Sequence, residues 1–279
     1  MTHDEHHPHH HHTAAGSGET VMAELLDLDA EVLRTYASDV TAWLAGLTEE
    51  RPPRRILDLG SGTGTGTLAL LERFDEAAAT ALDISPLMLH HLRSKACARG
   101  FGERVRTVQA DLDAPWPVLD TADLVWAASS LHHMADPARV LAEVFGTLRP
   151  GGLLAVTEMD FFPRFLPDSV GAGLEARVHT ALRRDHGQGE LTSLLLGAGF
   201  VLEAERPFVV DLRAPLPEAA RRYAQVCLGR LRERLDGLVD ETDLATLDTL
   251  LDGDGPESLL RREDLTVRTT RTVWVAKRP

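Results

Sequence analysis

The stretch ILDLGSGTG, residues 56–64, decides the fold of this chain. Its first four residues are apolar except for Asp58, a pattern typical of a short parallel strand that is buried on both faces. Glycine then occurs at every second position, and glycine allows positive φ and a close approach of the backbone to a ligand. Residues 65–71, TGTLALL, favour a helix start, so the loop lies at a helix N-terminus, where anions bind. The stretch therefore predicts a strand, a glycine loop and a helix around a nucleotide-type cofactor.

The spacing of the glycines discriminates between cofactors. Dinucleotide sites carry the pattern G-x-G-x-x-G, but the third glycine position of this chain holds Thr65. The chain instead fits the pattern D-x-G-x-G-x-G, with Asp58, Gly60, Gly62 and Gly64. Taken alone, such a cluster is also compatible with an ordinary turn. The spacing therefore disfavours a nicotinamide oxidoreductase and leaves the turn as the alternative.

The composition excludes several classes of partner. Asp and Glu outnumber Lys and Arg by 43 to 29 among the 279 residues, and no basic run is present to bind DNA or RNA. Cys97 and Cys227 are the only cysteines, which suits a reducing compartment and forbids a disulfide framework. No apolar run reaches roughly 18 residues, so we expect a cytoplasmic protein that does not enter a membrane. We also expect no bound metal and a monomer or homodimer.

The chain divides into three parts. Residues 1–18 form a His-rich leader or tag, which we expect to be disordered and exclude from the fold. Residues 19–50 carry apolar residues at helical spacing, which predicts an N-terminal helical lid. Residues 51–279 alternate strands and helices as a doubly wound parallel sheet does, with insertions at 159–188 and 215–262. The last strand, residues 266–276, alternates in the manner of an antiparallel edge strand.

Further segments place chemistry-bearing residues at the ends of predicted strands. Asp83 ends the second strand about 20 positions after the glycine loop, the spacing of an acid that grips ribose hydroxyls. Alternatively, Asp83 caps the helix that begins near Ser85. Asp111 ends the third strand, and its alternative role is that of a surface turn acid. Residues 131–133, LHH, follow the fourth strand, and residues 149–152, RPGG, precede the fifth as a tight turn.

In their order and spacing, these segments of residues 55–158 resemble the class I S-adenosylmethionine (SAM)-dependent methyltransferases, especially those of ubiquinone and menaquinone biosynthesis. The resemblance implies a Rossmann-like, doubly wound α/β fold with a seven-stranded sheet, an antiparallel last strand and helical lids. It implies SAM as the cofactor, with Asp83 on the ribose, Asp111 and Leu112 on the adenine, and Trp126 beside the methionyl group. The implied cofactor-binding residues are Asp58, Gly60, Ser61, Gly62, Gly64, Asp83, Ile84, Met88, Asp111, Leu112 and Ala128.

The resemblance also places the loop after the fourth strand beside the reactive methyl group. His132 and His133 are the candidate catalytic bases, because histidine titrates near neutral pH; alternatively, they only cap the loop or pack against the sheet. Phe161, Phe162 and Phe165 follow the fifth strand and favour a small-molecule acceptor that is aromatic or partly apolar. The alternative function is that of a catalytically silent, SAM-binding methyltransferase-like protein.

Overall fold

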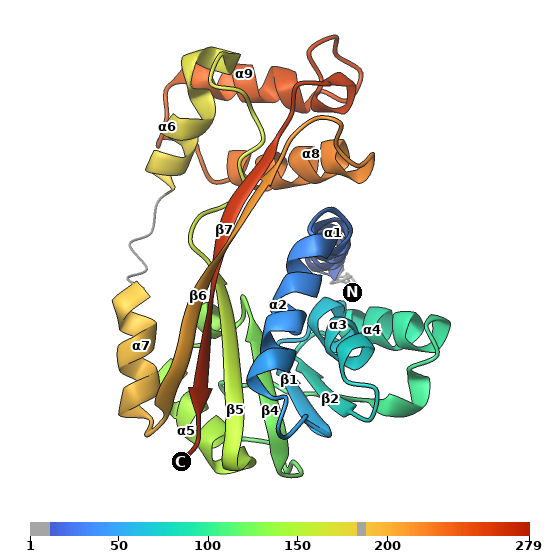
Figure 1. Ribbon diagram of the computed structural model, residues 1–279. Coiled ribbons are helices and arrows are strands. Elements are labelled where there is room, and N and C mark those ends of the chain that lie inside the picture. Colours follow the sequence, from blue (N-terminus) through green and yellow to red (C-terminus); the bar gives the residue numbers. More distant parts are fainter. Residues whose placement is uncertain (1–11, 183–187) are drawn as a thin grey trace, which may run out of the picture.

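A single seven-stranded sheet organises the computed structural model, which describes residues 12–182 and 188–279 (Figure 1). Within these residues the strand order is β3-β2-β1-β4-β5-β7-β6. β7 runs antiparallel to β5 and β6, and all other neighbours are parallel. This confirms the Rossmann-like fold. The strands are β1 (Arg55–Leu59), β2 (Ala78–Asp83), β3 (Val105–Gln109), β4 (Ala122–Ala128), β5 (Leu148–Met159), β6 (Val201–Leu212) and β7 (Val267–Lys277).

The position of β7 corrects one expectation. β7 is antiparallel as predicted, but it lies between β5 and β6, and β6 takes the edge of the sheet. The reason is visible in its second half, where residues 273–276 are all buried. A strand with neighbours on both sides and helices on both faces buries every residue, whereas an edge strand keeps one row of backbone groups exposed.

Helices cover both faces of the sheet (Figure 1). α2 (Arg34–Leu47) and α3 (Thr65–Arg73) pack on one face, where Val40, Leu70 and Trp126 share an apolar cluster with Ile56. α4 (Pro86–Ala98) packs beside α3 through Leu92. α5 (Pro137–Thr147) and α7 (Gln188–Gly197) cover the opposite face through a second cluster. The result is a three-layer α/β/α core.

A helical cap stands on the far end of the β6–β7 ribbon (Figure 1). β5 ends where Met159 pairs with Arg271, but β6 and β7 continue together to the pair of Leu212 and Val267. The cap helices are α6 (Leu174–Ala181), α8 (Ala219–Arg232) and α9 (Glu241–Leu251), which come from the two insertions. They share one apolar cluster with the ribbon end, and residues of the N-terminal helices also enter it. The ribbon therefore carries a second core above the sheet.

The N-terminal helix begins earlier than the sequence analysis expects. α1 spans His12–Val32, so residues 12–18, which the sequence analysis assigned to the leader, are helical. Residues 1–11, the rest of the leader, lie outside the described residues. Across the part of the chain that is described, no helix has the length and apolar character needed to cross a membrane.

A buried ion pair joins α1, the cap and the sheet. The carboxylate of Asp29 in α1 accepts from both terminal nitrogens of Arg271 in β7, at 3.0 Å for Nη1. The hydroxyl of Tyr223 in α8 donates to the same carboxylate at 2.6 Å. The Arg271 guanidinium also lies 5.1 Å from the centroid of the Tyr36 ring, and Tyr36 Oη lies 2.7 Å from Thr157 Oγ1 in β5. Three separate elements thus meet at one charge pair.

Replacing Arg271 tests how much this pair contributes to stability. The two side chains are only 12% and 22% exposed, and removal of one partner leaves a buried charge uncompensated. We expect Arg271→Met to lower the free energy of unfolding by about 3 kcal/mol, as measured by urea denaturation. Arg213→Met is the control, because the Arg213–Asp211 pair is 75% and 41% exposed and we expect its loss to cost less than about 1 kcal/mol. Equal losses in the two variants would contradict this account.

Candidate functional site

The glycine loop turns sharply at the carboxyl end of β1. Gly60 and Gly64 have φ values of 66° and 91°, which side chains disfavour. A Cβ on Gly60 would also lie 2.7 Å from Cβ of Ser130, and one on Gly64 would lie 2.5 Å from Cγ of Leu92 in α4. Glycine is therefore required by backbone angle and by space. The contact at Ser130 brings the loop against the segment that follows β4.

Asp83 lies at the end of β2 and connects two segments. Its Oδ2 accepts from the backbone N of Gly62 at 2.8 Å, and its Oδ1 accepts from the backbone N of Ser85 at 2.9 Å. α4 is capped by Ser85, whose Oγ accepts from Met88 N at 3.3 Å, so Asp83 does not cap this helix. Each carboxylate oxygen has a second lone pair, which a hydroxyl can use. The next side chain, Ile84, is 62% exposed and offers an apolar surface beside this carboxylate.

Asp58 has a different role from Asp83. Its side chain is buried in the core, and Thr67 Oγ1 of α3 donates to its Oδ2 at 2.5 Å. Burial raises the pKa of Asp58 to about 7, and the nearby charge of Asp83 acts in the same direction. Asp58 therefore fixes the first turn of α3 to β1, beneath the loop, and supports the site from inside.

Asp111 follows β3 at the same edge of the sheet. Its side chain is exposed, and its Oδ1 accepts from Asp113 N at 2.9 Å, so the turn role is realised. Leu112 is buried in the cluster that covers the α5 face. Because β2 and β3 are parallel neighbours, their carboxyl ends place Asp83 and Asp111 along one rim.

The exit of β4 carries strain and unpartnered hydroxyls. Ser129 directly follows Ala128 and has a φ of 50°, although it is not a glycine, and such residues gather at functional sites. Its backbone N donates to Thr157 O at 2.8 Å, which holds the exit against β5. The hydroxyls of Ser61 and Ser130 are buried and have no hydrogen-bond partner among the described residues. Two polar atoms beside the glycine loop thus have no partner among the described residues and are available to a ligand.

Histidine and glutamate meet between β4 and β5. His132 lies in the short 3₁₀ turn η2 (Leu131–His133), and its Nδ1 is 2.7 Å from Oε2 of Glu158 in β5. The other oxygen, Oε1, is buried and has no partner in the described part of the protein. The rings of His132 and His133 lie 4.0 Å apart between centroids. Sequence reasoning missed Glu158, although an acid at a strand end is the same signal that singled out Asp83.

α1 lies across the glycine loop. Thr63 Oγ1 donates to Oδ1 of Asp27 at 2.7 Å, and Lys95 of α4 forms an ion pair with the same oxygen. A Cβ on Gly62 would lie 2.8 Å from Cδ1 of Leu26 in α1. The N-terminal helix is therefore held directly over the loop by one hydrogen bond and one ion pair.

Two expected site residues lie elsewhere. Trp126 packs in the core against α3, where its Nε1 would clash with a Cβ on Gly66, so its expected place beside the methionyl group is wrong. Phe165 is fully buried in the cap, 5.3 Å from the Tyr223 ring, and lines no acceptor site. Phe161 and Phe162 are each 36% exposed and are thus available for contact.

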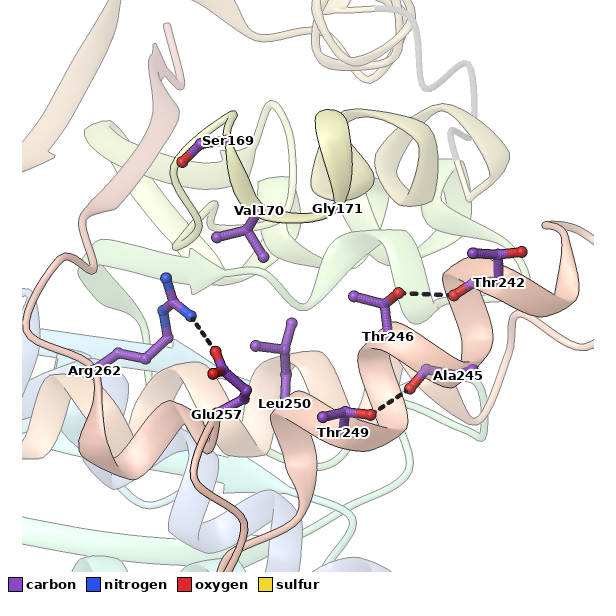
Figure 2. A pocket seen from close by; sticks show the side chains of 10 residues that line it. All are labelled: Ser169, Val170, Gly171, Thr242, Ala245, Thr246, Thr249, Leu250, Glu257 and Arg262. Carbon is purple, nitrogen blue, oxygen red and sulfur yellow. Dashed lines mark hydrogen bonds and ion pairs between the residues drawn. The ribbon is translucent and has the colours of Figure 1, made fainter.

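An open groove of about 570 Å³ lies in the cap, between η3 (Val170–Ala172) and α9 (Figure 2). The hydroxyls of Thr246 and Thr249 in this groove donate to carbonyls of their own helix, and Arg262 pairs with Glu257 at 3.8 Å. These polar groups are thus already engaged, and the groove is remote from the glycine loop (Figure 1). No cluster of His, Cys, Asp and Glu suited to a metal ion occurs among the described residues.

Comparison with known proteins agrees with this geometry. Residues 56–152 match a family described as "Methyltransferase domain". The chain is 42% identical over 136 residues to a demethylmenaquinone methyltransferase of Thermus thermophilus, and the match covers 48% of this chain and 57% of the relative. It is 28% identical to the 27-O-demethylrifamycin SV methyltransferase of Amycolatopsis mediterranei, over 80% of this chain and 78% of the relative.

Solved structures extend the similarity to the whole fold. A protein from Bacillus halodurans C-125, provisionally assigned as a methyltransferase, has a TM-score of 0.55 at 19% identity, and the match covers 86% of this chain and 98% of that one. At this identity the likeness concerns the fold alone. The chain spans about half the length of the first curated relatives that it matches. Residues 56–152 of this chain are therefore similar to a methyltransferase domain, and the sheet has the fold of solved methyltransferase-like proteins.

Proposed function

We propose that this chain transfers a methyl group from SAM to a small-molecule acceptor. The observation that carries the proposal is the edge of the sheet where the glycine loop, the Asp83 carboxylate and two unpartnered buried hydroxyls lie together. A cofactor with ribose hydroxyls and a charged amino-acid end fits this set of groups, since hydroxyls suit a carboxylate and charged groups suit free hydroxyls. The exposed Ile84 adds an apolar surface for an aromatic base.

Each residue has a separate task in holding the donor. Asp83 would accept from the ribose hydroxyls, and Asp111 lies along the same rim for the adenine. Ser61 and Ser130 would satisfy the methionyl end with their free hydroxyls. SAM supplies a methyl group that its sulfonium already activates, so the protein has mainly to align the acceptor and exclude water. α1, held over the loop by Asp27, would provide that exclusion.

His132 is the residue best placed to remove a proton from an acceptor hydroxyl or amine. Glu158 at 2.7 Å fixes the proton of the neutral ring on Nδ1, which leaves Nε2 as the acceptor of a proton. Glu158 then stabilises the positive ring that results, as a carboxylate does when it orients a catalytic histidine. His133, whose ring is tilted against that of His132, stays the second candidate from the sequence.

Transfer of label tests the proposal directly. The full chain is incubated with SAM that is labelled in its methyl group and with panels of small phenols, carboxylic acids and amines. We expect label in at least one small-molecule class and calorimetric binding of SAM in preference to NAD. A chain that binds NAD, or that fails to bind SAM, would contradict the proposal. Binding of SAM without transfer to any panel would favour the silent alternative.

Asp83→Asn tests the donor site. The carboxylate accepts from Gly62 N and Ser85 N and has room for two hydroxyls, whereas an asparagine offers a single acceptor oxygen for all of these donors. We expect the affinity for SAM, measured by calorimetry, to fall at least about tenfold, the loss typical of a charged hydrogen bond. Asp120→Asn, in an exposed loop residue, is the matched control and should bind SAM as the wild type does. Similar affinities in the two variants would refute the assignment of Asp83.

Glu158→Gln tests the proton-transfer pair. With the acceptor found by label transfer, His132→Ala should lower the turnover rate about a hundredfold, the effect typical of a general base. Glu158→Gln keeps the shape of the side chain but removes its charge, and we expect a smaller loss of about tenfold. SAM affinity should stay unchanged in both, because neither residue holds the donor. If His133→Ala abolishes turnover while His132→Ala does not, the roles of the two histidines are exchanged.

Other features remain predictions from the sequence. An aromatic or partly apolar acceptor is supported by the half-exposed Phe161 and Phe162 near the end of β5. The subgroup of quinone-biosynthesis enzymes is supported by one relative that covers about half of this chain. The cytoplasmic location and the monomeric or homodimeric state also stay as expectations.

A further inference from the structure

Two arginines lie directly opposite each other where the segment after β5 meets β7. Arg164 N donates to Arg268 O at 2.8 Å, and Arg268 N donates to Arg164 O at 2.9 Å. In such an antiparallel pair, the two side chains project from the same face of the ladder. Like charges in this arrangement repel each other and destabilise the pairing. The pair therefore calls for a compensating negative charge.

The described residues do not supply that charge through an ion pair. Neither Arg164 nor Arg268 forms a salt bridge in residues 12–182 and 188–279, whereas Arg177 and Arg271 of the same region do. Among the described residues, the Nε atoms of Arg164 and Arg268 are both buried and have no hydrogen-bond partner. Nη2 of Arg268 donates to Leu166 O at 3.1 Å. Asp211 lies opposite Arg268 in the β6–β7 ladder, and the charge of Arg268 lowers the pKa of Asp211, but the two Asp211 oxygens accept from Arg213.

Glu175 of α6 is close to the arginines but is already engaged. Its two oxygens accept from Phe165 N at 2.7 Å and Leu166 N at 3.0 Å. Burial raises its pKa to about 7, while the charges of Arg268 and Arg164 oppose the rise. One carboxyl, already engaged by two backbone donors, faces two guanidinium groups, which therefore keep a positive excess.

A buried histidine one turn further along α6 has a free ring nitrogen. His179 is only 8% exposed, and its Nε2 has no hydrogen-bond partner among the described residues. Burial lowers the pKa of His179 to about 4, and the charge of Arg164 acts in the same direction. The ring is thus neutral at neutral pH and can donate a hydrogen bond from Nε2. Three nitrogens in this part of the cap are without a partner.

The arginine pair lies on the same face of the ribbon as the proton-transfer pair. Side chains of β7 alternate, so Arg268 shares a face with Thr272, whose partner in the ladder is Glu158. The Oγ1 of Thr272 donates to Asp160 Oδ1 at 2.8 Å, which confirms that this face is shared with the end of β5. The four residue steps from Thr272 to Arg268 correspond to about 13 Å along the strand.

We propose that Arg164 and Arg268, together with His179, form a subsite for an anionic group of the methyl acceptor, a carboxylate or a phosphate. A planar guanidinium pair suits either group, because each presents paired donors to paired oxygens. The acceptor would then be elongated, because Arg268 lies about 13 Å along β7 from Thr272, the ladder partner of Glu158. This role as an acceptor subsite rests on the proposed function, but the binding of an anion does not.

Anion titration of the full chain tests the subsite without any turnover. Arginine is labelled with ¹⁵N, and the Nε–H resonances are followed by NMR while inorganic phosphate or acetate replaces chloride at constant ionic strength. We expect saturable shifts of the Arg164 and Arg268 resonances, assigned through Arg164→Gln and Arg268→Gln, and at least a tenfold loss of affinity in each variant. Arg54→Gln, which removes an exposed arginine paired with Glu76 at the start of β1, should bind as the wild type does. The stronger of the two anions identifies a carboxylate or a phosphate.

Other outcomes overturn the inference. Shifts in the wild type that rise linearly without saturation show that no site exists, and this result does not depend on the folding of any variant. Equal affinity in Arg164→Gln, Arg268→Gln and the wild type places the anion elsewhere. SAM is titrated on the same samples, so the two proposals fail separately. Anion binding without SAM binding supports the subsite and contradicts the proposed function. SAM binding without anion binding contradicts the subsite and leaves the proposed function standing.

Discussion

The close contact between Gly60 and Ser130 is the constraint on which the site depends. At 2.7 Å from Ser130 to the position of a missing Cβ, no other residue fits at the end of β1. The contact fixes the distance between the loop that would hold the donor and the turn that carries His132. The relative placement of the glycine loop and this turn is therefore set by main chain on rigid strands, and long side chains have little part in it. Sites built this way lose little entropy when they bind.

The sequence was sufficient for the features that depend on local pattern. β1, the glycine loop and the acid at the end of β2 follow from residue type and spacing over about 30 residues. The interior position of β7 was not predictable, because strand alternation does not reveal which neighbours a strand pairs with. The positions predicted for two aromatic residues were wrong for a related reason. Trp126 and Phe165 are near strand ends in sequence, but the face on which each side chain lies depends on packing with α3 and with the cap.

The pairing of His132 with Glu158 could not be predicted from local sequence pattern either. The two residues are separated by 26 positions and meet only because β4 and β5 are parallel neighbours. Which charged side chains meet in and near the cap also depends on tertiary structure. Asp29 neutralises Arg271 from a helix 242 positions away, while Arg164 and Arg268 are brought together by the ribbon next to carboxylates that are engaged by other groups. Burial of a charge is costly unless it is compensated, so the two arginine environments have opposite implications: the first stabilises the fold and the second is suited to a ligand.

The ribbon of β6 and β7 separates the cap from the strands that carry the glycine loop and Asp83. Both cap insertions leave the sheet at β5 and β6, and neither of these strands neighbours β1 or β2, which carry the donor loop and Asp83. Changes of length or composition in the cap therefore leave the strand pairs around the donor loop intact. In evolutionary terms, such a scaffold can change its cap while it inherits the strand pairs around the glycine loop, as expected where function is grafted onto a shared fold.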